Sequence, residues 1–277
     1  MLRLVYRLPF LGILMAAYLL GGLAAGLLPG RIRRWKARAW WTHILSRAAL
    51  PLLGIHGVHC PASRKNPGGG VLNVANHLSY LDILILSSLR PSLFVTSQEV
   101  RRDPLLGTLT RLGGSLFVER RSHSGLKAEI GALSRVLKEG AQVVLFPEAT
   151  SGNGETPLPF RSALLQAALD GEVPVQGTCL SYIWVDDQSF GPGVRDRVCY
   201  YGDHRFLPHL LGLLRVRRVD VVTMDLPAVI PYPGLTRHDL ADALHRRITR
   251  IYDSFLPDPG DRPAEVGGGA LEGSVLI

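Results

Sequence analysis

Cysteine, lysine and acidic residues are scarce in this sequence of 277 residues. The three cysteines, Cys60, Cys179 and Cys199, are odd in number and show no C-x-x-C spacing. This pattern argues against a disulfide framework or a zinc site and favours a reducing compartment. The sequence also lacks an internal repeat and a G-x-S-x-G nucleophile elbow.

Positive charge dominates, and most of it is arginine. The formal net charge is +8, and only four of the 31 basic residues are lysines. Such a balance favours an anionic partner, such as a lipid surface or an acidic substrate, although biased codon usage also produces an arginine excess. Nucleic acid is not expected as a partner, because the positive charge clusters beside an apolar segment rather than among exposed aromatic residues.

The N-terminal region contains an uncharged apolar segment, residues 8–28. As a helix it would extend about 32 Å, close to the thickness of a bilayer core. Five basic residues and three tryptophans follow in residues 31–41, so the positive-inside rule predicts a membrane anchor with the rest of the chain in the cytoplasm. A cleaved signal peptide and a buried helix are the alternatives. Spanning and one-leaflet insertion both remain open, because four residues could break the helix: Pro9, Gly12, Gly21 and Gly22.

The remaining sequence alternates apolar strand patterns with helical patterns. Strands are expected at residues 70–76, 91–97, 114–120, 141–148, 173–182 and 218–230, and helices at 31–54, 79–89, 103–112, 124–139, 162–171 and 235–255, the last with Thr236 as its N-cap. This order predicts an α/β fold, a mainly parallel sheet covered by helices, with an N-terminal membrane-anchoring helical segment. We expect membrane-associated helices in residues 1–60, a catalytic domain in 61–256 and a disordered tail in 257–277.

The stretch VLNVANHLSYLDILIL, residues 71–86, sets a histidine and a carboxylate into an apolar run. A carboxylate one helical turn after His77 could reach back to it, fix its tautomer and stabilise its protonated form while it acts as a general base. The alternative is structural: Ser79 and Asp82 form the S-x-x-D pattern of a capping box, and His77 is a satisfied core histidine. Without a nucleophile elbow, the nucleophile would be a substrate hydroxyl or water.

Two further regions carry polar residues after strands. Arg120 and Arg121 either mark a return to solvent or bind a phosphate or carboxylate. Residues 146–165 contain a strand end, then Glu148, which is either functional or a turn cap, then a long loop, and then Arg161 at the start of the next helix.

Four short blocks occur in an order that resembles the glycerophospholipid acyltransferases, the 1-acylglycerol-3-phosphate O-acyltransferase family. They are N-H-x-x-x-x-D at Asn76–Asp82, G-x-x-F-x-x-R at Gly114–Arg120, F-P-E-x-T at Phe146–Thr150 and V-P-V at Val173–Val175. The resemblance implies a membrane enzyme of the bacterial inner-membrane type, with its active site on the cytoplasmic side. It would move a fatty acyl group from an acyl carrier protein or coenzyme A thioester to a lysolipid hydroxyl, without a cofactor or metal.

The resemblance also implies residue roles. His77 would be the general base and Asp82 its orienting partner. The residues implied or expected to bind the acceptor are Asn76, Gly114, Phe117, Arg120, Pro147, Glu148, Thr150 and Arg161. The Val173–Val175 strand would line the acyl channel.

Departures from the family pattern concern the acceptor. The third block commonly reads F-P-E-G-T-R-S, but here Ala149 replaces the glycine and Ser151 replaces the arginine that binds phosphate. Gln176 replaces the common second proline of the fourth block, and Arg161 could supply the missing charge. Together with YYGDHRFLPHLLGLL, residues 200–214, these features look like the branch that acylates lyso-ornithine lipids.

Three functions therefore remain open. The first is acyl transfer to lysophosphatidate or lyso-ornithine lipid, the second is a membrane-bound esterase or thioesterase that uses the same His/Asp pair on water, and the third is a non-enzymatic protein that binds lipid surfaces.

Overall fold

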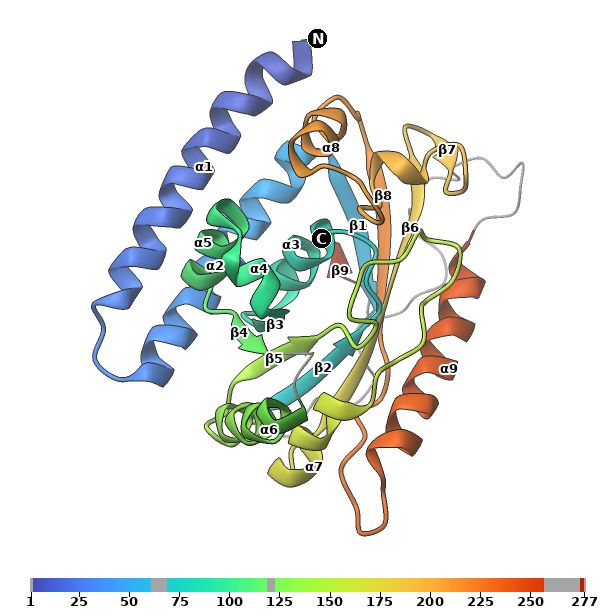
Figure 1. Cartoon of the computed structure of the whole chain (residues 1–277). Coiled ribbons are helices and arrows are strands. Elements are labelled where there is room, and N and C mark those ends of the chain that lie inside the picture. Colours follow the sequence, from blue (N-terminus) through green and yellow to red (C-terminus); the bar gives the residue numbers. More distant parts are fainter. Residues whose placement is uncertain (1, 61–68, 119–122, 257–274, 277) are drawn as a thin grey trace.

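A computed structural model describes residues 2–60, 69–118, 123–256 and 275–276 (Figure 1). Its helices are α1 (Leu2–Gly26), α2 (Arg31–Leu53), α3 (Leu81–Leu89), α4 (Gln98–Arg102), α5 (Pro104–Leu112), α6 (His123–Lys138), α7 (Gln166–Gly171), α8 (Phe206–Leu213) and α9 (Arg237–Phe255), with 3₁₀ turns at Ala163–Leu165 and Arg195–Arg197. Its strands are β1 (Ile55–Cys60), β2 (Val71–Ala75), β3 (Leu93–Ser97), β4 (Leu116–Val118), β5 (Gln142–Leu145), β6 (Val175–Val185), β7 (Gln188–Ser189), β8 (Val219–Asp225) and β9 (Val275–Leu276).

The strands form one sheet in the order β4-β3-β5-β2-β6-β8-β1-β9, with β7 paired to β6. The pairs from β4 to β6 are parallel, as is β8 with β1, whereas β6 pairs antiparallel with β8 and β7 and β1 pairs antiparallel with β9. The expected α/β fold with a mainly parallel sheet is therefore confirmed. Every residue of the central strands β2 and β6 is buried, as expected when helices cover both faces of a sheet.

Helices cover both faces of this sheet. In Figure 1, α1, α2 and α3 lie on one side of the sheet and α9 on the other. The sequence of α9 buries one stripe at helical spacing, made of Leu240, Ala241, Leu244, Ile248 and Tyr252. The predicted N-cap is confirmed, because the Thr236 hydroxyl accepts a hydrogen bond from the Asp239 N–H.

The two N-terminal helices form a tightly packed hairpin. The Trp41 Nε1–H donates to the Ala17 carbonyl at 3.0 Å. A Cβ atom at Gly21 would lie 2.0 Å from Trp41 Nε1, so the glycine permits this close crossing. The helix α1 continues from Leu2 to Gly26 with Pro9 inside it. The possible breaks at Pro9, Gly12, Gly21 and Gly22 are thus not present.

The start of α1 is also attached to the segment after α8, about 210 residues further along the chain. Arg7 is buried, and its guanidinium donates to the carbonyl oxygens of Leu214 at 3.2 Å and Val216 at 2.6 Å. A buried arginine needs such acceptors, because an unpaired buried charge is costly. This contact joins the N-terminal end of α1 to the segment that follows α8.

Two regions differ from the sequence-based expectations. Residues 55–60, which we grouped with the N-terminal helices, form strand β1 inside the sheet and pair with β8 along their whole length. In the expected disordered tail, Val275 and Leu276 pair antiparallel with β1, while residues 257–274 and 277 lie outside the described residues. The sequence IHGVHC of β1 is short and contains two histidines and a glycine, so its apolar pattern is weak.

Candidate active site

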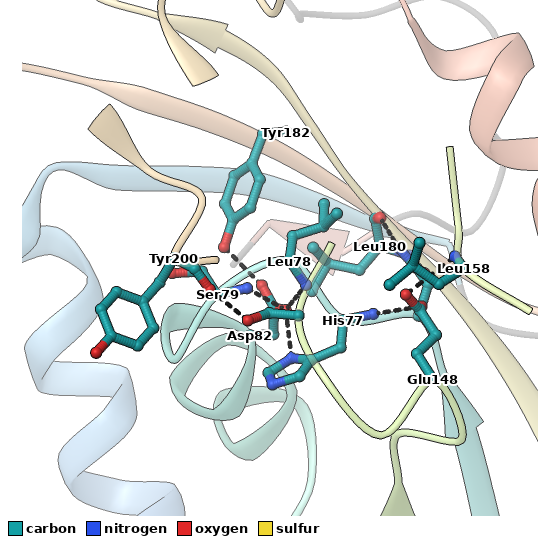
Figure 2. Close-up of polar contacts among 11 residues, drawn as sticks. His77, Leu78, Ser79, Asp82, Glu148, Leu158, Leu180, Tyr182 and Tyr200 are labelled. Atoms are coloured by element: carbon teal, nitrogen blue, oxygen red, sulfur yellow. Dashed lines mark hydrogen bonds and ion pairs between the residues drawn. The ribbon is translucent and has the colours of Figure 1, made fainter. Parts of the chain in front are cut away.

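The His77 and Asp82 side chains meet at the end of β2. His77 lies two residues after Ala75, the last residue of this strand, and Asp82 lies in the first turn of α3. The imidazole Nδ1 lies 2.9 Å from Asp82 Oδ2 (Figure 2). The Asp82 carboxylate is fully buried, whereas the imidazole is 19% exposed. The spacing of five residues thus produces the contact that the sequence predicted.

The Asp82 carboxylate is held by four hydrogen-bond donors. Its Oδ2 also accepts from the Leu78 N–H at 2.6 Å and the Ser79 N–H at 2.9 Å. Its Oδ1 accepts from the Tyr182 hydroxyl at 2.6 Å. Burial, reinforced by the Asp82 charge, raises the pKa of Tyr182, so the hydroxyl keeps its proton and donates. This arrangement fixes the carboxylate and gives a buried anionic group the hydrogen bonds it needs.

The capping interaction that the sequence offered as the alternative role of Asp82 is present together with the His77 contact. Asp82 accepts the Ser79 N–H, which is the carboxylate half of a capping box. The hydroxyl half is missing, since the Ser79 Oγ has no hydrogen-bond partner among the described residues. Asp82 therefore both caps the start of α3 and orients His77.

The His77 ring is fixed on one face by an aromatic contact. It stacks on Phe146, with centroids 4.0 Å apart and ring planes 13° from parallel. Within the described part of the chain, Nε2 makes no hydrogen bond that would occupy it. Because Asp82 holds Nδ1 as a donor, Nε2 is the nitrogen that can accept a proton from a substrate.

Glu148 joins the loop after β5 to the His77 loop. Its Oε1 accepts the His77 N–H at 2.8 Å and its Oε2 accepts the Leu158 N–H at 3.0 Å (Figure 2). Burial raises the pKa of Glu148 to about 8, and the two N–H groups act in the opposite direction. The side chain is buried, and its two hydrogen bonds hold the backbone at His77 and at Leu158 together.

Other contacts hold the loop of residues 146–161 in place. The Gly152 N–H donates to the His77 carbonyl at 2.8 Å, and the Arg161 N–H donates to the Pro147 carbonyl at 3.0 Å. Ala149, where the family pattern has glycine, adopts φ = 65°. This left-handed conformation costs an alanine roughly 1–2 kcal/mol. Ala149 thus adopts a left-handed backbone conformation that glycine adopts more easily.

The remaining predicted residues come from the end of β2, the loop of residues 146–161 and the edge strand β4. Asn76 is fully buried, and its amide exchanges two hydrogen bonds with the Leu180 backbone, both 2.8 Å. Thr150 and Arg161 are exposed on the loop. Gly114 precedes the edge strand β4, where Phe117 lies under the Arg101 guanidinium at 5.4 Å. Arg120 and Arg121 lie outside the described residues.

The structure adds residues that sequence reasoning missed. Tyr182 reaches Asp82 from β6, 100 residues further along the chain. Tyr200 donates its N–H to the Leu78 carbonyl at 2.9 Å, and its carbonyl accepts a hydrogen bond from the Ser151 hydroxyl. No local pattern in the sequence could indicate these contacts, because each depends on how distant segments are placed by the sheet.

Metal binding finds no support in the part of the chain that the structure covers, where no group of three or more His, Cys, Asp or Glu side chains could hold an ion.

Comparisons with known proteins agree with this geometry. A family described as Acyltransferase matches residues 57–181, which include His77, Asp82 and Glu148. The chain is 33% identical over 233 residues to a protein named lyso-ornithine lipid O-acyltransferase from Rhizobium meliloti, covering 81% of this chain and 77% of that one. It is 35% identical to a protein of the same name from Pseudomonas aeruginosa, covering 83% and 88%.

A second group of relatives has a different name. The chain is 36% identical to the 1-acyl-sn-glycerol-3-phosphate acyltransferase of Neisseria gonorrhoeae over 138 residues, 50% of this chain and 54% of that one. A crystal structure of the 1-acyl-sn-glycerophosphate acyltransferase PlsC from Thermotoga maritima matches the fold with a TM-score of 0.61 at 18% identity, covering 90% of both chains. This chain belongs to the acyltransferase family that includes proteins of both names.

Proposed function

We propose that this protein transfers a fatty acyl group from a thioester to the hydroxyl of a lysolipid at a membrane surface, and that its acceptor is lyso-ornithine lipid. The observation that supports this best is the His77–Asp82 pair. Its carboxylate is buried and held by four donors, and its second imidazole nitrogen is available to a substrate. The pair lies inside the region that matches the acyltransferase family.

His77 acts as a general base and then as a general acid. Its Nε2 accepts the proton of the acceptor hydroxyl while that oxygen attacks the thioester carbonyl carbon. The hydrogen bond from Nδ1 to Asp82 stabilises the imidazolium that forms. When the tetrahedral intermediate collapses, the carbon–sulfur bond breaks and the thiolate receives the proton from Nε2. The products are an ester and a free thiol, and the enzyme returns to its starting protonation state.

Ser151 supports the choice of acceptor. At this position the family pattern has an arginine suited to phosphate, whereas the Ser151 hydroxyl donates to the Tyr200 carbonyl. The loop after β5 is thereby joined to the aromatic segment 199–206, and the phosphate ligand is absent. The relatives named lyso-ornithine lipid O-acyltransferase also align over more of the chain than the other group, 81–83% against 50%.

The exposed face of α1 supports membrane association. The described residues include one helix long and apolar enough to cross a bilayer, Arg3–Gly26. Its outward side chains include Phe10, Ile13, Leu20 and Leu23. The opposite side is attached to the folded domain near both ends, through Arg7 and through Arg38, which donates to the Gly22 carbonyl. A helix attached to the domain in this way favours insertion into the cytoplasmic leaflet of the inner membrane.

Competing acceptors test the proposal. Purified membranes with a labelled acyl donor receive lyso-ornithine lipid and lysophosphatidate together, with the donor given as either an acyl carrier protein or a coenzyme A thioester. We expect preference for lyso-ornithine lipid, and loss of transfer by at least about 100-fold in His77→Ala, since general-base catalysis contributes 10²–10⁴-fold. Preference for lysophosphatidate would show that the acceptor is wrong, and normal transfer by His77→Ala would show that the mechanism is wrong.

The same assay separates acyl transfer from hydrolysis. An esterase or thioesterase with this dyad would release free fatty acid at a rate that does not depend on the acceptor. We expect release of the thiol to depend on the lysolipid concentration and to match the ester formed.

A further inference from the structure

A charged cavity lies beside α8, outside the His77 site. Its volume is about 390 Å³, which is within the range of small-molecule sites. The charged side chains that line it are Asp186, Asp196, Arg197 and Arg215. Two carboxylates and two guanidinium groups leave its wall with no net charge.

A histidine in the cavity wall is neutral and connects the cavity to the active-site helix. His209 Nε2 lies 3.0 Å from the Cys199 carbonyl, which can only accept, so this nitrogen carries the hydrogen. Nδ1 then accepts from the Tyr80 hydroxyl at 3.0 Å. Burial lowers the pKa of His209, consistent with the neutral form. Tyr80 immediately precedes α3, the helix that carries Asp82.

Two exposed leucines of α8 directly precede residues that line the cavity, Pro208 and Gly212. Leu207 and Leu211 of α8 are exposed by 60% and 39%. The segment after α8 also accepts the Arg7 hydrogen bonds from α1, and α8 lies near the N-terminal half of α1 in Figure 1. A lipid with its acyl chain along this surface would bring its head group to the cavity.

We propose that this cavity binds the zwitterionic head group of the lysolipid acceptor, with its ammonium at Asp196 and its carboxylate at Arg215. The proposal rests on the proposed function and specifies how the acceptor is chosen. Equal numbers of both charges suit a head group that carries both, whereas two carboxylates would repel a purely anionic phosphate. Both carboxylates already have partners. Asp186 uses both oxygens, since Oδ1 accepts the Arg217 N–H at 2.6 Å and Oδ2 lies 3.6 Å from Arg197 Nη1. Asp196 uses only Oδ1, which accepts from the Tyr201 hydroxyl at 2.6 Å, so its Oδ2 is the carboxylate oxygen that we assign to the ligand.

Single charge removals test this site. The variants are Asp196→Asn and Arg215→Gln, and the matched controls on α9 are Asp242→Asn and Arg250→Gln, both exposed and outside the cavity lining. The measurement is the kinetics of lyso-ornithine lipid acylation in mixed micelles. We expect the KM for the acceptor to rise about threefold to tenfold in each cavity variant, because an exposed ion pair contributes modestly to affinity, with kcat unchanged. The controls should match the wild type.

The outcomes separate this proposal from the proposed function. If the wild type acylates lyso-ornithine lipid and the cavity variants keep its KM, the cavity proposal is overturned and the function stands. If the wild type does not acylate this lipid, binding of a short-chain Nα-acyl-ornithine is measured directly. Binding weakened by both variants would still support the site, and no binding would overturn it. Binding of short-chain lysophosphatidate that only Arg215→Gln weakens would assign the cavity to anions and also overturn it.

Discussion

Tyr182 is the residue whose role the structure defines most sharply beyond the dyad. Its hydroxyl is 2.6 Å from Asp82 Oδ1, on the carboxylate oxygen that His77 does not use. In Tyr182→Phe the carboxylate loses one of the four donors that fix its position against the His77 ring, and its charge, no longer shared with that hydroxyl, favours the imidazolium already in the free enzyme. We expect kcat to fall about tenfold, equivalent to about 1.4 kcal/mol, with an unchanged KM for the acceptor. The acidic limb of the pH profile of kcat/KM should move to higher pH.

Tyr252→Phe is the matched control for this measurement. Tyr252 is as buried as Tyr182, and its hydroxyl also donates one hydrogen bond, at 2.7 Å to the Gly154 carbonyl. Loss of a buried hydrogen bond destabilises both variants by similar amounts. Only Tyr182→Phe should move the pH profile. A profile that stays in place in both variants would reduce Tyr182 to a packing residue.

The parts of the site predicted from sequence are those that are close in sequence. His77 and Asp82 are five residues apart, on a short loop and in the first turn of the helix that follows it, so the local chain brings the carboxylate back to the ring. Tyr182 was not identified, because it lies within an apolar run, and only the position of β6 beside β2 brings its hydroxyl to Asp82. The substrate role of Asn76 stays a prediction, and the structure adds that its amide extends the pairing of β2 with β6 by bonding to the Leu180 backbone.

At the scale of elements, Glu148 determines how the loop of residues 146–161 is attached to the His77 loop. Its carboxyl pKa rises from an ordinary value of 4.5 to about 8 in the folded protein. A raised folded-state pKa gives stability that is fully present below pH 4.5 and is lost as the pH rises through 8. In Glu148→Gln this titration is absent, and one of the two N–H groups loses its acceptor, which costs about 1–3 kcal/mol. We therefore expect the variant to be less stable, with a Tm deficit that is larger at about pH 5 than at about pH 9.

Glu155→Gln, in the same loop, provides the control. Glu155 is exposed and pairs with Arg195, and this hydrogen bond lowers the pKa of its carboxyl. Its small contribution should therefore be present above the unfolded pKa and be lost on acidification, which is the opposite sign. Thermal unfolding in detergent at several pH values distinguishes the two. A Tm deficit of Glu148→Gln that grows with pH would contradict the raised pKa of Glu148.

Helices and strands were predicted from the sequence wherever their apolar residues repeat with a clear helical or strand pattern. The fully buried strand β2 and the amphipathic helix α9 were predicted, including the Thr236 cap. Strand β1 was not, because its short sequence with two histidines has no strong pattern and its place is set by pairing with β8. The order of the strands in the sheet could not be predicted from the sequence either. Strand β2 lies between β5 and β6, and neither of them follows it directly in the chain.

At the scale of the whole molecule, the position of α1 distinguishes between the two ways in which the protein could bind the bilayer that we propose as its partner. One face of this helix contacts α2 and α5, as shown by the hydrogen bonds from Trp41 to Ala17 and from Tyr18 to Leu109. The other face exposes apolar side chains from Val5 to Leu23. If α1 crossed the bilayer, Arg7 and its acceptors after α8 would have to enter the hydrocarbon, at a considerable cost for a buried charge.

This geometry predicts the topology of both ends of α1. Val5→Cys and Leu27→Cys place thiols at exposed positions near the two ends, and the native Cys60, Cys179 and Cys199 are buried. In intact spheroplasts, a membrane-impermeant maleimide should label neither variant, and both should react once detergent is added. Labelling of Val5→Cys alone before detergent is added would show that α1 spans the membrane. In that case the contact between Arg7 and the segment after α8 could not persist, and the domain would have to separate from the first half of the helix.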